Sequence, residues 1–501
     1  MPRSLAALLL VAAHLPADTG NAACAPCHRA LHDSYLRTPM ASTSGRAGSG
    51  GERFDRAAFG DYRVFRDGGR IAFEASGARK ALDFFIGSGA VARSYAFFDG
   101  GFLFQAPVAY YSAGARWNLA PGFARYNYPY LTRPVLPGCL DCHSSRIQPV
   151  EGTQHAFRDP PFLESGVSCE RCHGPGERHV STARASDIVN PVRLDPERRD
   201  SVCAQCHLTG EFRIPRASSA GFRAGGRLSD SLAIFVWADR RPGLTVTSHG
   251  EKLAQSACRQ ASGDRLWCGS CHSVHASTRP AREKCLACHE PVACTESPAA
   301  RRGRNCVDCH MPRGEVVDAE HVVYTDHSIP RRPRAARATA DRTLAPFGGG
   351  AAAPRDLGLA YAQLALRESD AAVRERAFTL LRDAPPDTQV LLYLAELHKA
   401  ASDSARAAAL YQQVLRADPA QVTASVALGA LLMERGETAE AIRLWKDALA
   451  RSPGLQLVRM NLALAQLGQG DAASAEANLR KAVELNPALE VARKLLDGLR
   501  R

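Results

Sequence analysis

The chain repeats the pentapeptide Cys-x-x-Cys-His seven times within its 501 residues. This spacing is typical of covalent c-type haem attachment, in which two thiols add to the haem vinyl groups and the following histidine becomes the proximal iron ligand. Zinc knuckles also use Cys-x-x-Cys pairs, but zinc gives no reason for a histidine after every second cysteine. The pattern therefore predicts seven haem c groups.

The predicted haem residues fall into two sets. The attachment cysteines are Cys24, Cys27, Cys139, Cys142, Cys169, Cys172, Cys203, Cys206, Cys268, Cys271, Cys285, Cys288, Cys306 and Cys309. The proximal ligands are His28, His143, His173, His207, His272, His289 and His310.

The first 17 residues predict a secretion signal, because one arginine precedes an apolar run that is too short to span a bilayer. Export agrees with the cysteines, since haem attachment of this kind is expected outside the cytoplasm. We expect a periplasmic or secreted protein without a later transmembrane segment. Two cysteines outside the motifs, Cys258 and Cys294, are candidates for a disulfide.

The formal net charge of +12 does not indicate nucleic-acid binding. Seven haems would bring about 14 propionate carboxylates, which would leave the loaded protein close to neutral.

Changes in composition and in hydrophobic patterning along the chain predict several domains. Residues 18–330 form the multihaem domain, in which irregular chain and short helices are organised by the haems. Residues 52–135 interrupt it with a small antiparallel β insert, because apolar residues alternate around Asp67-Gly68-Gly69 and Asp99-Gly100-Gly101. Its tyrosines and phenylalanines either pack on a haem or form the core of the sheet. Residues 331–354 are rich in Arg, Ala, Pro and Gly and predict a linker.

Residues 355–501 predict an all-α solenoid. Prolines recur every 34 residues at Pro385, Pro419, Pro453 and Pro487, and leucines and alanines keep the same interval between them. The pattern resembles tetratricopeptide repeats, whose unit is a pair of helices. Such a domain either docks a peptide or protein partner or acts as a stabilising flank.

Seven histidines remain as candidates for the sixth, distal iron position. His275 and His32 lie three and four residues after proximal histidines, so each faces the same side as that ligand and can reach only a neighbouring haem. His179 follows a Gly-Pro-Gly turn and also fits a neighbouring iron. The full set of distal histidines is His32, His155, His179, His249, His275, His321 and His327.

Three stretches resemble the multihaem cytochromes related to the tetrahaem electron carrier of ammonia oxidation, in the branch with C-terminal tetratricopeptide repeats. They are CERCHGPGERH, SHGEKLAQSAC before CGSCHSVH, and CVDCHMPR before HVVYTDHSIPRRP. The resemblance implies His179, His249 and His275 as distal ligands, with His321 or His327 or both. His155 is a candidate only because the count of histidines equals the count of haems.

The first motif departs from this family. Relatives carry a histidine about a dozen residues after it, where this chain has Thr38-Pro39-Met40. Met40 is therefore an alternative to His32, and a His/Met haem would have a higher potential than its bis-histidine neighbours.

These features predict a secreted heptahaem cytochrome that transfers electrons between redox partner proteins, with the repeats docking one of them. One alternative is a reductase of a small nitrogen or sulfur oxide, an oxidoreductase with one open haem position. A second alternative is an interaction scaffold with structural haems. No residue is assigned a catalytic role.

Overall fold

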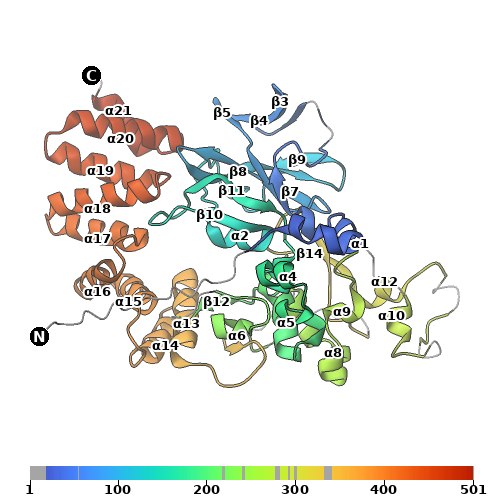
Figure 1. Ribbon diagram of the computed structural model, residues 1–501. Coiled ribbons are helices and arrows are strands. Elements are labelled where there is room, and N and C mark those ends of the chain that lie inside the picture. Colours follow the sequence, from blue (N-terminus) through green and yellow to red (C-terminus); the bar gives the residue numbers. More distant parts are fainter. Residues whose placement is uncertain are drawn as a thin grey trace, which may run out of the picture.

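The computed structural model describes residues 18–52, 54, 56–216, 221–239, 243–276, 282–290, 294–297, 302–331 and 341–499. The expected secretion signal, residues 1–17, lies outside them. Figure 1 shows three regions: a β-rich region, a region of short helices that carries the Cys-x-x-Cys-His motifs, and a helical solenoid at the C-terminal end.

The β-rich region contains two antiparallel sheets. One has the strand order β1-β6-β7-β8-β9 and the other β2-β3-β4-β5. The strands are β1 (Ser44–Arg46), β2 (Arg56–Phe59), β3 (Tyr62–Asp67), β4 (Arg70–Ala75), β5 (Ala78–Ala81), β6 (Phe84–Ile86), β7 (Ala92–Asp99), β8 (Phe102–Tyr111) and β9 (Arg116–Leu119).

Both expected hairpins are present. Asp67 pairs with Arg70 across Gly68-Gly69, whose φ angles are 54° and 84°. Positive φ at both positions is typical of a two-residue turn whose backbone twist matches that of the two strands it joins. Gly100-Gly101 joins β7 to β8 in the same way, with φ angles of 60° and 85°. Glycine is needed there because other residues rarely adopt positive φ.

The aromatic residues of this region form its own core. Phe73, Tyr95 and Phe97 are at most 1% exposed and pack with Val64 and Ile71 in one cluster. Of the two roles open to these aromatic residues, the structure places this group in the sheet core.

The motif-bearing region consists of short elements. Its helices are α1 (Ala25–Tyr35), α2 (Pro137–His143), α3 (Glu170–His173), α4 (Glu177–Thr182), α5 (Pro196–His207), α6 (Leu228–Ser231), α7 (His249–Gln255), α8 (Ala257–Ser262), α9 (Cys268–Cys271), α10 (Arg282–Leu286) and α12 (Cys306–His310). Its strands are β10 (Ser144–Pro149), β11 (Phe157–Ser165), β12 (Phe212–Pro215), β13 (Leu232–Trp237), β14 (Arg313–Glu315) and β15 (Val323–Thr325).

The expected linker, residues 331–354, contains a strand. β16 (Leu344–Pro346) pairs with β13 and completes the sheet β12-β13-β16. The buried hydroxyl of Tyr361, in the first solenoid helix, accepts a hydrogen bond from the Leu344 backbone N–H at 3.0 Å. This part of the linker prediction is therefore corrected: residues 344–346 belong to a packed sheet, because their apolar side chains and backbone groups find partners there.

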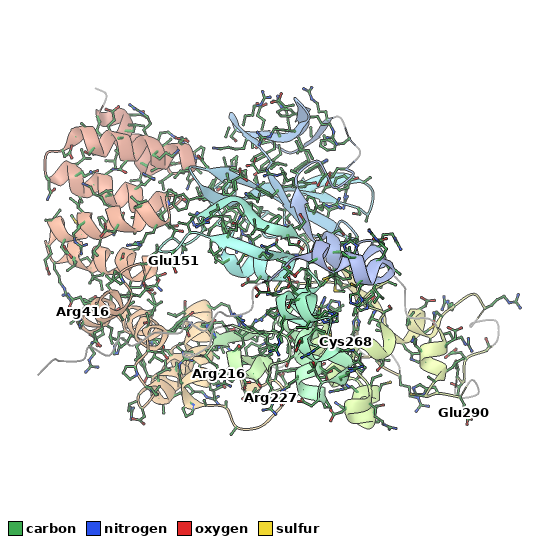
Figure 2. All side chains as sticks on the ribbon, in the orientation of Figure 1. Glu151, Arg216, Arg227, Cys268, Glu290 and Arg416 are labelled. Carbon is green, nitrogen blue, oxygen red and sulfur yellow. The ribbon has the colours of Figure 1, made fainter. Side chains whose placement is uncertain are left out.

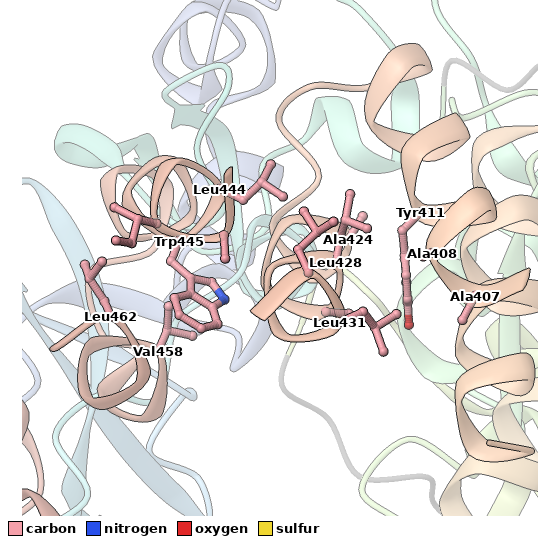
Figure 3. Packing of buried hydrophobic residues seen from close by; sticks show 14 of the residues in the cluster. Ala407, Ala408, Tyr411, Ala424, Leu428, Leu431, Leu444, Trp445, Val458 and Leu462 are labelled. Atoms are coloured by element: carbon pink, nitrogen blue, oxygen red, sulfur yellow. The ribbon is translucent and has the colours of Figure 1, made fainter. Parts of the chain in front are cut away.

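The solenoid stacks helices in antiparallel pairs, and Ala407, Ala441 and Ala475 are fully buried where helices cross. Figure 3 shows Tyr411 and Trp445 filling the space between neighbouring helices. The helices are α13 (Pro354–Glu368), α14 (Ala371–Leu381), α15 (Thr388–Ala400), α16 (Ser404–Ala417), α17 (Val422–Glu434), α18 (Thr438–Arg451), α19 (Gln456–Gly468), α20 (Ala472–Leu485) and α21 (Glu490–Leu499).

The solenoid contacts the rest of the chain at two separate places. At its start, α13 packs on the β12-β13-β16 sheet in a shared apolar core. Further along, the turn between α18 and α19 touches the β-rich side, where Gln154 donates its backbone N–H to the Arg451 carbonyl at 3.1 Å and the Thr132 hydroxyl donates to Gln456 Oε1 at 3.0 Å. Two attachment points hold the solenoid against the N-terminal part of the chain (Figure 1).

Candidate haem-binding site

A cavity of about 3040 Å³ runs through the motif-bearing region, and all seven Cys-x-x-Cys-His motifs contribute to its walls. Ordinary small-molecule pockets measure about 300–1,000 Å³, so this cavity is large enough for several bulky groups. Cys268, one of its wall residues, lies among the short helices in Figure 2. The short helices therefore surround a shared interior space that few apolar side chains fill.

Four of the motif histidines have a second histidine ring at about the distance expected for two imidazoles that bind opposite sides of one metal ion. Two metal–nitrogen bonds of about 2 Å, with about 1.1 Å from each nitrogen to its ring centre, place the centres of two opposed imidazole ligands about 6.2 Å apart. The observed ring-centre distances are His28–His179 at 6.2 Å, His173–His275 at 6.0 Å, His272–His327 at 6.2 Å and His207–His249 at 5.5 Å.

Backbone carbonyls orient several of these rings. Nδ1 of His179 lies 2.8 Å from the Arg184 carbonyl, and Nδ1 of His173 lies 2.8 Å from the Val189 carbonyl. Nδ1 of His327 lies 2.9 Å from the carbonyl of Thr325. An Nδ1–H that donates to a carbonyl leaves the Nε2 lone pair free for a metal, which is the usual arrangement of metal-binding histidines.

Burial keeps the inner histidines neutral. Desolvation lowers the pKa of His249 to about 3, and it also lowers the pKa of His207 and of His272. Nδ1 of His143 and Nδ1 of His249 are buried without a hydrogen-bond partner in the described residues. Neutral imidazoles around an apolar interior are the donors that haem iron uses, so the residues present fit the group.

Motif thiols from different parts of the chain lie beside one another. In four pairs the two thiols are within hydrogen-bonding reach. The pairs are Cys24 with Cys169, Cys142 with Cys206, Cys203 with Cys268, and Cys285 with Cys306.

Electrostatic interactions between thiols connect these pairs to one another. Cys172 acts on both Cys203 and Cys206, and Cys271 acts on Cys285. The seven motifs therefore form one connected set of neighbours, which branches at the fourth motif.

Neither candidate near the first motif lies opposite His28, because His179 occupies that place. Nδ1 of His32 lies 3.0 Å from Asp33 Oδ1, and the His32 side chain is largely buried. Met40 begins a short 3-10 turn, and its carbonyl accepts a hydrogen bond from the Val167 N–H at 3.0 Å. Both side chains line the cavity.

His155 and His321 lie outside the cavity walls. His155 is 1% exposed and packs against Phe102 and Phe104, with ring centres 5.1 and 4.9 Å away. His321 lies at the surface, where its Nε2 is 3.1 Å from the Asn118 side-chain nitrogen. One ring is enclosed in the core of the β-rich side and the other is held at its edge, and the role of these two histidines as iron ligands stays a prediction.

The expected disulfide is absent, since Cys258 and Cys294 both have free thiols. The Cys258 thiol instead interacts electrostatically with Cys271 and Cys285 of neighbouring motifs.

Two tyrosines near the histidine pairs were not predicted. Tyr35 meets the His275 ring nearly edge-on at 6.3 Å, and Tyr324 meets the His249 ring in the same way at 5.5 Å. Tyr35 also donates its hydroxyl proton to the Val167 carbonyl at 2.6 Å. The only sequence signal was their position, since Tyr35 shares a helix with the first motif and Tyr324 lies between His321 and His327.

No helix in the described part of the chain is both long and apolar enough to span a bilayer.

Two family models match separate parts of the chain. The model described as cytochrome c554 and c-prime matches residues 129–174, which hold the second and third motifs, and the tetratricopeptide repeat model matches residues 392–456 and 426–490. The chain is also 27% identical over 219 residues to the multiheme cytochrome MtrA of Shewanella baltica strain OS185. That similarity covers 39% of this chain and 54% of MtrA, so the chain spans about half the length of this relative.

Solved structures match less than a third of the chain, at low TM-scores. MamA from Desulfovibrio magneticus RS-1 is 22% identical, with 30% of this chain and 85% of MamA covered at a TM-score of 0.27. YrrB, described as a TPR protein with an unusual peptide-binding site, is 15% identical, with 28% and 72% covered at a TM-score of 0.24. A cytochrome model matches part of the motif-bearing region and a repeat model matches most of the solenoid, so the chain is similar to multihaem c-type cytochromes in the first region and to tetratricopeptide repeat proteins in the second.

Proposed function

We propose that this chain is a secreted heptahaem cytochrome that transfers electrons between redox partners in the periplasm or outside the cell. The fourteen motif cysteines attach the haems, and the seven motif histidines are their proximal ligands. Haem c supplies one-electron chemistry when bound, and the protein sets its ligands, its spacing and its surroundings. The secretion signal that the sequence predicts at residues 1–17 supports this location, as does the number of motif cysteines, because haem attachment of this kind is expected outside the cytoplasm.

Four histidines serve as distal ligands in this proposal: His179 opposite His28, His275 opposite His173, His249 opposite His207, and His327 opposite His272. In each pair the distal histidine comes from outside the motif that it completes. Each pair therefore ties together two segments that are remote in sequence, and haem binding closes the fold as well as the site.

The observation that carries the proposal is that the thiols of all seven motifs lie in one connected set. The first motif neighbours the third, the third neighbours the fourth, and the fourth neighbours both the second and the fifth. The sixth follows the fifth and the seventh follows the sixth. Attachment points that lie near one another keep the redox groups close together throughout the set, which is what transfer of single electrons through a protein requires.

Intact mass and spectroscopy of the mature protein, purified from a host that matures c-type cytochromes, test this proposal. The mass should equal the polypeptide plus seven haems, and an added one-electron donor should reduce all of them. The double variant Cys306→Ala/Cys309→Ala should carry six haems. Cys258→Ser, which changes a cysteine outside the motifs, is the matched control and should carry seven. A colourless protein with no added mass would refute the proposal.

A second function is favoured by one observation. Within the described residues, no further histidine ring faces His143, His289 or His310, and His155 and His321 lie away from the cavity. An open position on one of these three haems would suit reduction of a small nitrogen or sulfur oxide. Electron paramagnetic resonance separates the two functions, because a reductase would show a high-spin haem whose signal changes when nitrite or cyanide is added.

A further inference from the structure

The core of the β-rich region contains a buried tyrosine and carboxylate that haem binding does not use. Tyr95 on β7 is fully enclosed, and its hydroxyl donates a hydrogen bond to Glu52 Oε1 at 2.8 Å. The Glu52 side chain is also fully buried, and it forms an ion pair with Arg93 at 3.2 Å. Burying a carboxylate is costly, and apolar residues of similar volume often serve a fold equally well. The carboxylate beside Tyr95 therefore indicates a role other than packing.

Two further aromatic rings shield Tyr95 from water. The ring centres of Tyr95 and Trp117 are 4.9 Å apart, with an angle of 31° between the ring planes. Tyr110 meets the same indole nearly edge-on at 5.5 Å, and Trp117 itself is 5% exposed. A phenol loses an electron more readily than the ring of phenylalanine does. A radical formed on Tyr95 would be protected from solvent and from dissolved reductants.

Loss of an electron from Tyr95 is coupled to loss of its proton. Burial raises the pKa of the Tyr95 phenol and the negative charge of Glu52 raises it further, so the phenol stays protonated in the resting protein. An oxidised phenol is a strong acid, and the hydrogen bond gives its proton a direct path to Glu52 Oε1. The other carboxylate oxygen, Oε2, has no hydrogen-bond partner among the described residues. Glu52 can therefore take up the proton without any rearrangement.

The buried pair lies on the opposite face of the sheet from the haem cavity. Successive residues of a strand point to opposite faces, so Tyr95 faces the sheet core while its neighbour Ser94 lines the cavity. Ile86, which pairs with Ser94 across β6 and β7, lines the cavity as well. Just before β1 of the same sheet, the Thr43 hydroxyl donates to the His143 carbonyl at 2.7 Å. One layer of sheet thus separates Tyr95 from the cavity wall beside the second motif.

We propose that Tyr95 and Glu52 form a proton-coupled redox site that gives an electron to hydrogen peroxide reacting at a haem of the cavity. Reduction of hydrogen peroxide to two waters takes two electrons and two protons. The haem at which it reacts supplies one electron, Tyr95 supplies the other, and solvent supplies the protons. The phenolic proton of Tyr95 moves to Glu52 Oε1 and leaves a neutral tyrosyl radical.

Electrons passed along the haems then reduce both the reacting haem and the radical, and the proton returns from Glu52 to Tyr95. The site would protect the haems from damage by peroxide. This inference rests on the proposed haems and on one of them having an open position. His143, which lies beside this sheet, is one of the three motif histidines that no further histidine ring faces within the described residues.

Rapid freezing after addition of hydrogen peroxide to the oxidised, haem-loaded protein tests the site by electron paramagnetic resonance. The wild-type protein should give a radical signal whose shape changes when the protein contains ring-deuterated tyrosine, which identifies a tyrosyl radical. Tyr95→Phe keeps the buried ring and should lose most of this signal. Tyr111→Phe is the matched control and should keep the signal, because Tyr111 is 1% exposed but donates to the Leu119 carbonyl at 2.8 Å and not to a carboxylate.

Glu52→Gln separates proton transfer from packing, because it keeps a hydrogen-bond acceptor beside Tyr95 and removes the proton acceptor. The radical signal should fall in this variant although Tyr95 is present. Circular dichroism and haem content at wild-type values check the fold of each variant. No radical in the wild-type protein, or a wild-type yield in Tyr95→Phe or Glu52→Gln, would overturn the inference. A protein that carries seven haems and passes electrons without forming the radical would lose this inference and keep the proposed function.

Discussion

The burial of the His155 ring predicts how the free energy of unfolding changes with pH, and this change can be measured. The imidazole lies between Phe102 and Phe104, and both of its nitrogens are buried without a partner in the described residues. Protonation of such a ring is strongly opposed, because the charge has neither water nor a counter-ion. Burial accordingly lowers the pKa of His155 from 6.5 to about 4.

The lowered pKa determines how stability changes with pH. Between pH 6.5 and pH 4 the unfolded chain binds a proton at this ring and the folded protein does not, so the free energy of unfolding falls as the pH falls. The whole shift corresponds to about 3 kcal/mol, of which about 2 kcal/mol is lost between pH 7 and pH 5. His155→Phe removes the titrating group and keeps an aromatic ring between the two phenylalanines.

Urea unfolding of the haem-loaded protein at pH 7 and pH 5 measures this difference. The wild-type protein should lose about 2 kcal/mol more than His155→Phe over that interval. The visible and electron paramagnetic resonance spectra of the two proteins at pH 7 should be the same. Parallel pH profiles would show that His155 is not held neutral by burial. Loss of a low-spin haem signal in the variant would show that it is an iron ligand after all.

Two further predictions concern the haem ligands and the attachment of the solenoid. His179→Ala should convert one haem, that of His28, from low spin to high spin in the electron paramagnetic resonance spectrum, whereas His32→Ala should leave every signal unchanged. The reverse result would exchange their roles. Tyr361→Phe should lower the free energy of unfolding by about 1–3 kcal/mol, because it leaves the buried Leu344 N–H without an acceptor. Denaturant unfolding measures this, and an unchanged midpoint would show that the hydrogen bond adds nothing.

Local patterns in the sequence predicted much of the fold. The Asp-Gly-Gly turns predicted both hairpins, since a two-residue turn of this kind selects glycine at positive φ. The interval of 34 residues predicted the helix pairs, because each repeat packs mainly on its neighbours. Strand β16 was not predicted: its three residues carry no pattern of their own, and they become a strand only beside β13.

The sequence alone predicts which side chains can attach haem and which histidine would lie beneath each iron, because covalent attachment depends on spacing within five residues. Only the tertiary structure decided which histidine faces which. His28 and His179, or His173 and His275, meet because helices remote in the chain line the same cavity, and no local pattern records a distance through space. Only the tertiary structure likewise shows that His155 is enclosed by Phe102 and Phe104, because a count of histidines cannot show which rings are buried.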